Sequence, residues 1–334
     1  MTPTGFWNPS AETLPRERLA AWQWRKLSRA LARARQGSKF WATRIPDGVT
    51  SLREYVTRVP PVRLPELLAA QAMSPPYGTL PSTDPALGIA YHETGAYHET
   101  SGETPLRSFD TARDWAWAVD MWCTALYAAG VRAHHTGCVT SGRGPTVGFW
   151  GMRNALARIG CQVVPAGGMD AGARVRLLVE RQVEVLGATP AYALRLLDAA
   201  RELGVDLAAD GSLRVIVAGE PVPAPTRRAL ADGFGARISD VAGLTELATV
   251  SSFECDRGSR HIIEGDFVEE VLHPETGHPV GYGEPGVRVT TGLGREGIQI
   301  FRYWTGESAV KRPWHECGCG RTWDWYSRRG GEIP

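Results

Sequence analysis

Short apolar runs alternate with helical patterns between residues 161 and 241, and no other feature restricts the fold as much. In chain order these segments are 161–165, 171–186, 191–203, 213–218, 224–232 and 236–241, of which the first, fourth and last are of strand length. Strands joined by helices pair in parallel, and the connecting helices cover both faces of the sheet. We therefore predict an α/β body whose ligand lies at the carboxyl ends of the strands.

The segments on either side of this body have different characters. Apolar residues recur at helical spacing from residue 14 to 35, and prolines are frequent between residues 40 and 90, which favours a wrapping segment with short helices. After Thr249 the chain is β-rich, so we expect a small antiparallel sheet or barrel packed on the α/β body. The predicted units are an N-terminal segment (1–85), an α/β body with parallel strands (86–247) and a β-rich subdomain (248–334).

The composition is that of a globular protein with a large core. The 334 residues are 43% hydrophobic and 22% charged, which suits one large or two ordinary domains. A formal net charge of +1 gives no attraction to nucleic acid or anionic membranes. The chain opens without a basic and apolar leader pattern, and no run of about 18 apolar residues follows. We expect a cytoplasmic protein with neither nucleic acid nor a membrane among its partners.

Four short stretches carry groups that can bind or react with a ligand. They are 98–105, 219–221, 240–246 and 301–307. The first combines hydroxyls, a glycine and carboxylates, so its backbone N–H groups and hydroxyls can hold phosphate oxygens or a metal-bound water. Taken alone, an ordinary polar turn is the commoner explanation of such a stretch. Because the first three stretches follow predicted strands at one edge of the sheet, we expect them to form one pocket.

In order and in sequence, the four stretches resemble the motifs of the adenylate-forming enzymes, in particular the phenylacetate-CoA ligase branch, over almost the whole chain. Thr-Ser-Gly-Glu-Thr-Pro resembles the phosphate loop T-S-G-T-T-G-x-P, and Leu-Thr-Glu at 244–246 resembles the pair that serves Mg-ATP. Arg-Tyr-Trp-Thr-Gly-Glu at 302–307 resembles the ribose-binding segment R-Y-R-T-G-D. The resemblance implies catalytic roles for Thr104, Glu246 and Arg302. It implies nucleotide binding by Thr100, Ser101, Gly102, Gly219, Glu220, Asp240, Gly243, Thr245 and Glu307.

The resemblance also implies the reaction and its cofactors, ATP and Mg²⁺. A carboxylate attacks the α-phosphorus of ATP and gives an acyl-adenylate and pyrophosphate. The small organic acid is expected to be aromatic and to lie in a pocket lined by residues 137–151 and the strand ends, and its acyl group passes to CoA or to an amine. Two alternatives stay open: a diazotase-like enzyme that activates nitrite, and a homologue that no longer adenylates and serves as a binding partner or acyltransferase.

The sequence departs from the family pattern on the nucleotide side. The phosphate loop is two residues short, lacks the second glycine and the basic residue, and carries Glu103. Ala242 stands where a tyrosine usually covers the adenine, and Glu307 replaces the ribose-binding aspartate. Together these changes allow a nucleotide site that is weakened, altered or lost.

A second departure concerns the C-terminal end. The family continues past a G-R-x-D-D hinge into a small domain with a catalytic lysine, whereas only two residues follow Glu332 here. We expect either a chain cut at the hinge or a one-domain variant whose lysine comes from a partner protein or is dispensed with. Without that cation, adenylation is expected to be slow unless an arginine replaces it. The candidates are Arg107, Arg143, Arg302 and Arg321.

Two cysteine-containing segments in the last third predict a metal site. One cysteine precedes a histidine by six positions, and two further cysteines flank a glycine. The predicted ligands are Cys255, His261, Cys317 and Cys319. Three sulfurs and one imidazole suit tetrahedral Zn²⁺, and a site closed by four protein ligands is structural. His273 and His315 compete for the histidine position, and the alternative is a set of reduced surface thiols.

Overall fold

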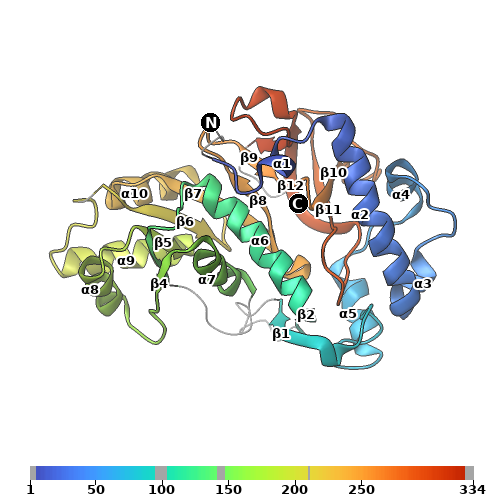
Figure 1. Ribbon diagram of the computed structural model, residues 1–334, viewed down its shortest axis with the longest axis horizontal. Coiled ribbons are helices and arrows are strands. Elements are labelled where there is room, and N and C mark those ends of the chain that lie inside the picture. The colour runs from blue at the N-terminus through green and yellow to red at the C-terminus, as the bar shows by residue number, and fades with distance from the viewer. Residues whose placement is uncertain (1–4, 95–103, 141–146, 210, 328–334) are drawn as a thin grey trace.

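The computed structural model describes residues 5–94, 104–140, 147–209 and 211–327, and one eleven-stranded sheet runs through them (Figure 1). The strands are β3 (Thr136–Val139), β4 (Gln162–Val164), β5 (Val185–Ala188), β6 (Arg214–Ala218), β7 (Ile238–Leu244), β8 (Thr249–Glu254), β9 (Arg260–Ile262), β10 (Phe267–Leu272), β11 (Pro285–Gly292), β12 (Tyr303–Arg312) and β13 (Trp325–Ser327). Their order in the sheet is β10-β11-β12-β13-β9-β8-β7-β6-β5-β3-β4.

The strands from β4 to β7 form the parallel half of this sheet. Their connecting helices are α7 (Val147–Ile159), α8 (Ala171–Glu180), α9 (Pro190–Glu202) and α10 (Ala224–Phe234). Adjacent side chains of one strand enter different hydrophobic clusters: Ile216 lies in one, and Val215 and Val217 lie in the other. Both faces are therefore covered, which explains why β5 and β6 are nearly continuous apolar runs. The α/β fold and the predicted strands at 161–165, 213–218 and 236–241 are confirmed.

The predicted helix over 171–186 is wrong at its C-terminal end. The helix α8 stops at Glu180, Gln182 adopts a left-handed backbone with φ 48°, and β5 begins at Val185. The apolar residues Val183 and Leu186 continue the helical spacing of α8, but they also fit a short buried strand. Periodicity alone does not separate the two elements here.

The β-rich last third does not form the separate sheet or barrel that we predicted. Strand β8 pairs antiparallel with β7, and β9 to β13 continue from β8 in the same sheet. The free edge of β7 carries backbone donors and acceptors that need partners, and an antiparallel strand satisfies them as well as a parallel one. One hydrophobic core includes Trp41, Trp122 and Phe301, one residue from each predicted unit. The unit boundaries near residues 85 and 247 stay a prediction.

The N-terminal segment wraps around the sheet, as its proline content predicts. Its helices are α1 (Pro9–Glu12), α2 (Arg16–Gly37), α3 (Lys39–Arg44), α4 (Leu52–Arg58), α5 (Leu64–Ala72) and the 3₁₀ turn η1 (Pro85–Leu87). The helix predicted over 14–35 is confirmed as α2. The amide Nε2 of Gln23 in α2 donates to the carbonyls of Glu264 and Phe267, at 2.9 Å each, and joins this helix to the start of β10. No helix in the described ranges is long and apolar enough to span a membrane.

A hairpin and a long helix precede the parallel half. The hairpin pairs β1 (Gly88–Glu93) with β2 (Arg107–Thr111), and α6 (Ala112–Ala128) follows directly. Thr111 and Asp114 form a capping box that satisfies backbone N–H groups at the start of α6. The helix crosses the middle of the molecule (Figure 1), and Thr249 of β8 donates through its hydroxyl to the Ala118 carbonyl at 2.8 Å.

Candidate active site

Two of the predicted stretches lie side by side at the carboxyl ends of adjacent strands. Ala218 and Val241 are register partners in β6 and β7, so Gly219 and Glu220 leave the sheet next to the stretch that leads to Glu246. Gly219 has a φ of +88°, which a glycine adopts without strain. The Glu220 carboxylate accepts a hydrogen bond from the Ala191 N–H at 3.0 Å, in the first turn of α9. These two stretches lie at the same edge of the sheet, and the pocket predicted for them together with the stretch 98–105 stays a prediction.

Glu246 is the point where the third and fourth stretches meet. It lies with Thr245 in the 3₁₀ turn η2 (Thr245–Leu247), and the Tyr303 hydroxyl donates to its Oε1 at 2.9 Å. Burial raises the pKa of Glu246, the hydrogen bond from Tyr303 opposes that rise, and the nearby charge of Glu307 adds to it. A half-buried carboxylate fixed by a phenol at the strand ends is suited to hold a divalent cation.

The structure directs Arg302 away from this carboxylate. Its guanidinium forms two hydrogen bonds of 2.8 Å with the Glu270 carboxylate and a third, of 2.6 Å, with the Val59 carbonyl. The residue is 5% exposed and has a left-handed φ of 46°, and its N–H donates to the Thr291 hydroxyl at 2.9 Å. Arg302 thus anchors the backbone immediately before Tyr303. The catalytic role that the family resemblance implies for Arg302 stays a prediction.

Two residues of the third stretch, Asp240 and Gly243, are explained by contacts within the sheet. Asp240 is buried in β7, where its carboxylate is ion-paired with Arg260 and its N–H donates to the Glu254 carboxylate at 3.2 Å. Gly243 lies at a bulge between β7 and β8, and a Cβ there would come within 2.3 Å of the Thr249 carbonyl oxygen. The nucleotide-binding roles predicted for both stay predictions, but the fold alone accounts for a glycine at 243.

Glu307 lies in β12 with its side chain half exposed. Its carboxylate accepts a hydrogen bond of 2.9 Å from the Arg288 guanidinium, which is buried and also pairs with Glu269. The charge of Glu307 contributes to the raised pKa of Glu246, so the two carboxylates are close enough to interact. The ribose-binding role predicted for Glu307 is compatible with this exposed position.

The predicted phosphate loop lies largely outside the described residues. Thr100, Ser101 and Gly102 belong to the segment 95–103, whereas Thr104 is described and exposed. The two ends of the segment are joined: the Thr94 N–H donates to the Leu106 carbonyl, and the Leu106 N–H donates to the Thr94 hydroxyl, both at 2.9 Å. Thr94 and Leu106 thus continue the pairing of β1 with β2 beyond the ends of the two strands.

Arg295 links this hairpin to the turn of Glu246, and the sequence gave no reason to single it out. Its guanidinium donates to the carboxylate of Asp110 in β2 at 2.6 Å and to the carbonyl of Glu246 at 3.1 Å. His92 of β1 contacts the same carboxylate at 2.6 Å. Burial opposes ionisation of Asp110, but the Arg295 charge and the His92 hydrogen bond outweigh it and lower the pKa of Asp110. A single arginine between Gly294 and Glu296 carries no sequence signal for such a role.

An apolar cavity of about 280 Å³ lies where the acid pocket is predicted. Its walls come from the end of β3, the first turns of α7 and the end of β4, and its charged residue is Arg153. Phe149 and Trp150 supply aromatic surface, and Val163 and Val164 supply the aliphatic wall. This cavity lies at the same carboxyl edge of the sheet as Gly219 and Glu246.

The four predicted metal ligands come together from distant parts of the chain. The ligand atoms of Cys255, His261, Cys317 and Cys319 all lie within 4.8 Å of one another. The Cys317 Sγ is 3.1 Å from His261 Nε2 and 3.5 Å from Cys255 Sγ, and Cys319 Sγ is 3.2 Å from the same Nε2. Ligand atoms that surround one tetrahedral Zn²⁺ at Zn–S bond lengths of about 2.3 Å are separated from one another by distances comparable to these.

The surroundings of His261 fit a metal ligand. Its Nδ1 lies 2.8 Å from the Trp323 carbonyl and donates to it, so that the lone pair of Nε2 faces the sulfurs. The competing residue His273 instead accepts from the N–H groups of Glu275 and Thr276 in an exposed turn. His315 is likewise not part of the cluster.

Comparisons with known proteins agree with this geometry. A family model described as AMP-binding enzyme matches residues 128–292. The phenylacetate-coenzyme A ligase of Thermus thermophilus is 29% identical over 328 residues, which cover 95% of this chain and 71% of that protein. The enzyme of the same name from Pseudomonas putida is 28% identical over 73% of this chain and 58% of its own length. This chain thus spans only part of each relative.

A solved structure extends the likeness to the fold. The crystal structure of 2-hydroxyisobutyryl-CoA ligase in an open conformation, with 2-HIB-AMP and CoA, superposes with a TM-score of 0.89 at 21% identity. The match covers 98% of this chain and 77% of that one. At this identity the likeness shows the fold of an acyl-CoA ligase. The chain is therefore similar to AMP-binding enzymes over residues 128–292 and to phenylacetate-coenzyme A ligases over most of its length, which supports an AMP-forming ligase.

Proposed function

We propose that this chain activates an aromatic carboxylic acid with ATP and passes the acyl group to CoA. In the first step a carboxylate oxygen attacks the α-phosphorus, the bond from that phosphorus to the bridging oxygen breaks, and pyrophosphate leaves with the bonding electrons. The hydrogen bond between Tyr303 and Glu246 carries this proposal, because it unites two nucleotide motifs around one half-buried carboxylate. The apolar cavity beside Phe149 gives the acid a place at the same edge of the sheet.

The proposed roles follow from donor chemistry. Glu246 holds Mg²⁺, which neutralises negative charge on the phosphate oxygens when it is bound. Tyr303 fixes the direction of that carboxylate, and Arg302 fixes the backbone that carries Tyr303. The hydroxyl of Thr104 and the segment before it contact the phosphates, and Glu307 contacts the ribose.

The cavity supports an organic acid rather than nitrite. Its lining is mostly aliphatic and aromatic, and burial of an aromatic ring there contributes roughly 25 cal/mol for each Å² of apolar surface removed from water. Nitrite has no apolar surface to bury. An amine in place of CoA as the acyl acceptor remains the alternative within this proposal.

The cation that balances charge at the α-phosphate is proposed to come from outside the described arginine candidates. Arg107 pairs with Glu93, Arg302 with Glu270 and Arg321 with Glu12, so each guanidinium is already engaged. Arg143 lies outside the described residues. A partner protein or domain that supplies a lysine would fill this role.

We also propose that the Cys/His cluster binds one structural Zn²⁺. A site with four protein ligands leaves no coordination position for a reacting water. Bound zinc would fasten the turn after β8 and strand β9 to the segment before β13, because the ligands come from all three.

The informative experiment is a substrate panel. Protein, ATP and Mg²⁺ are mixed in turn with phenylacetate, a benzoate, an aliphatic acid and nitrite, and pyrophosphate release is measured with and without CoA or an amine. We expect release with an aromatic acid and formation of its CoA thioester. Release with nitrite alone would replace the proposal by the diazotase alternative. No release with any acid, even when a lysine-bearing partner domain is added, would favour the non-adenylating homologue.

A further inference from the structure

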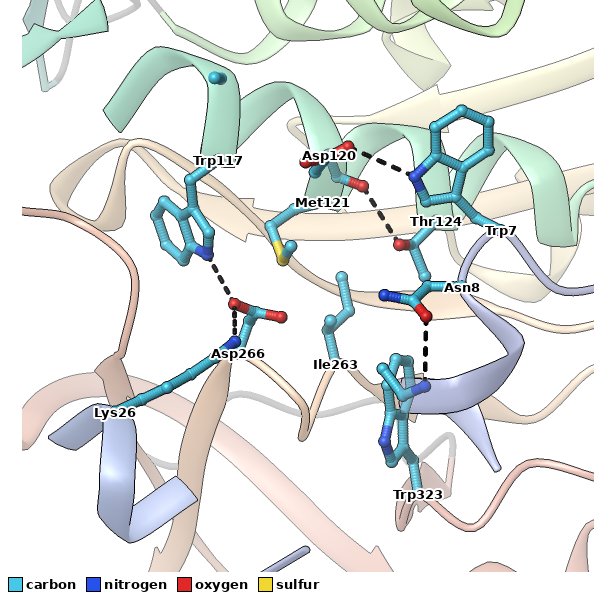
Figure 2. Close-up of a pocket in the computed structure, with 12 residues that line it drawn as sticks. Trp7, Asn8, Lys26, Trp117, Asp120, Met121, Thr124, Ile263, Asp266 and Trp323 are labelled. Atoms are coloured by element: carbon cyan, nitrogen blue, oxygen red, sulfur yellow. Dashed lines mark hydrogen bonds and ion pairs between the residues drawn. The ribbon is translucent and has the colours of Figure 1, made fainter. Parts of the chain in front are cut away.

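Two carboxylates of the molecule, Asp266 and Glu307, differ in how much of their bonding capacity the fold uses. Asp266 lies at the wall of a cavity of about 350 Å³ between α6 and the N-terminal segment (Figure 2). It binds the Lys26 ammonium at 2.7 Å and the Trp117 indole N–H at 2.8 Å, so it is fixed by the protein itself. The Glu307 side chain is instead 49% exposed, and Arg288 is the only partner of its carboxylate within the described part of the chain.

The backbone at Glu307 forms a bulge opposite Arg288. The pairing of β11 with β12 is interrupted there, and the three residues 305–307 of β12 lie opposite this one residue. The Thr305 hydroxyl donates to the Arg288 carbonyl at 2.9 Å and accepts from the Glu307 N–H at 3.0 Å. Gly306 between them has a left-handed φ of +77°. Bulges change the direction in which side chains leave a strand, and this one places Glu307 beside the Arg288 guanidinium.

Arg288 is held rigidly by groups inside the sheet. Its Nε and Nη2 donate to the two carboxylate oxygens of Glu269 at 3.0 Å and 2.7 Å, and Nη2 also donates to the Ser251 hydroxyl. The side chain of Arg288 is 3% exposed, and that of Glu269 is fully buried. A planar guanidinium that is paired on one side points its remaining nitrogen in a fixed direction. This nitrogen, Nη1, donates to Glu307 Oε2 at 2.9 Å.

The free side of Glu307 lies near the proposed nucleotide site. Burial raises the pKa of both Glu246 and Tyr303, and the negative charge of Glu307 adds to the rise in each. The Glu307 carboxylate is therefore close to this pair, whereas Arg288 contacts it from the sheet interior. A carboxylate has about four acceptor positions on its two oxygens, so Glu307 can accept further hydrogen bonds on its exposed side.

We propose that Arg288 is a positioning residue for nucleotide binding: it fixes one oxygen of the Glu307 carboxylate so that the other accepts hydrogen bonds from the ribose hydroxyls. This inference rests on the ribose contact of Glu307 in the proposed function. A glutamate has one more rotatable bond than an aspartate, so a free glutamate loses more conformational entropy when it binds a ligand. Arg288 removes much of that loss before the nucleotide arrives, without touching the nucleotide itself.

The test compares how tightly the full chain binds two nucleotides in the presence of Mg²⁺, measured by isothermal titration calorimetry. One is ATP, and the other is 2′,3′-dideoxyATP, which lacks both ribose hydroxyls. The ratio of the two dissociation constants isolates the contribution of these hydroxyls. The unmodified chain should prefer ATP by about tenfold or more, the effect of one hydrogen bond to a charged acceptor. Glu307→Ala should abolish this preference.

The variant that tests Arg288 combines Arg288→Met with Glu269→Gln, so that no lone charge is left buried. Its preference for ATP should fall about threefold or more, through weaker binding of ATP and unchanged binding of 2′,3′-dideoxyATP. The control combines Arg321→Met with Glu12→Gln and removes an equally buried arginine–glutamate pair elsewhere. This control should melt earlier and keep the preference. If the first double variant does not fold, Arg288→Lys keeps a charge beside Glu269 but replaces the planar fork by one ammonium, and the same fall in preference is expected.

The outcomes separate the role of Arg288 from that of Glu307. Arg288 has no positioning role if its variant folds and keeps the full preference for ATP while Glu307→Ala loses it, and the ribose contact of Glu307 then stands. An equal loss of affinity for both nucleotides would also overturn the positioning role, because it would show a structural effect only. Full preference in Glu307→Ala, or none in the unmodified chain, would refute the ribose contact and the role of Arg288 together.

Discussion

Replacement of Tyr303 by phenylalanine tests the role of the Glu246 carboxylate most directly. The change removes one hydroxyl and keeps the ring, so the packing around this 4% exposed side chain is retained. The lost hydrogen bond, of 2.9 Å, opposes the rise in the pKa of Glu246 that burial causes. Without it the pKa of Glu246 rises further, and protonation begins at a higher pH.

The size of the effect follows from the strength of the bond. A hydrogen bond to a charged group contributes about 1.5–3 kcal/mol, and 1.36 kcal/mol corresponds to one pH unit in a titration. Because Glu246 is only half buried, solvent screening places the effect at the lower end, at about one pH unit. If the carboxylate form holds Mg²⁺, activity is lost as the pH falls through this raised pKa, so the acid limb of the pH profile moves to higher pH.

The assay is kcat/KM for ATP, from pyrophosphate release, measured across the acid limb for the unmodified chain and Tyr303→Phe. Tyr326→Phe is a matched control, since the Tyr326 hydroxyl donates to the Glu269 carboxylate at 3.0 Å in the sheet interior. This control is expected to lower the melting temperature and to leave the acid limb in place. If the acid limb of Tyr303→Phe coincides with that of the unmodified chain, Glu246 does not act as the ionised metal ligand.

Three other outcomes are expected. Glu246→Gln should lower pyrophosphate release about 100-fold or more with little change in Tm, while the exposed Glu275→Gln leaves release unchanged; full activity of Glu246→Gln would remove Glu246 from the site. Arg295→Met should lower the free energy of unfolding, measured in urea, by about 3–5 kcal/mol, because Asp110 is left buried without its arginine. The control Arg113→Met, at an exposed ion pair, should lower it by about 0.5 kcal/mol or less. Equal effects of the two variants would contradict the linking role of Arg295. Protein purified without added metal should carry stoichiometric zinc, and Cys319→Ser should lose it and melt earlier while Cys123→Ser keeps it; a zinc-free protein with unchanged stability would refute the structural site.

Features with a local cause were predictable from the sequence. The alternation of strand and helix patterns predicts the parallel half of the sheet. Such patterns can be read locally, because the spacing of apolar residues in an element reflects which of its faces is buried. The spacing around Cys255 and Cys317 predicted a cluster that only the fold brings together. The order of the strands predicted that stretches 219–221 and 240–246 lie at one edge of the sheet, and the structure places them there.

Features that depend on distant partners were not predictable. Whether Arg302 faces a substrate or a buried carboxylate depends on Glu270, which lies on another strand of the sheet. Arg295 has no neighbouring pattern, and its partners in β2 and η2 are far away in the chain. The direction of each charged side chain is fixed by residues that are close only after folding.

The single sheet has a consequence for how this protein can be divided. Strand β7 ends at the turn that carries Glu246, and it pairs with β6 along one edge and with β8, which leads to the cysteine cluster, along the other. A fragment cut after residue 247 would leave a long central strand with an open edge, a template for intermolecular pairing. The segment that carries the proposed site therefore cannot be separated from the rest of the sheet as an independently folding fragment. A metal or nucleotide that binds at one end of the sheet should therefore raise the melting temperature of the whole chain.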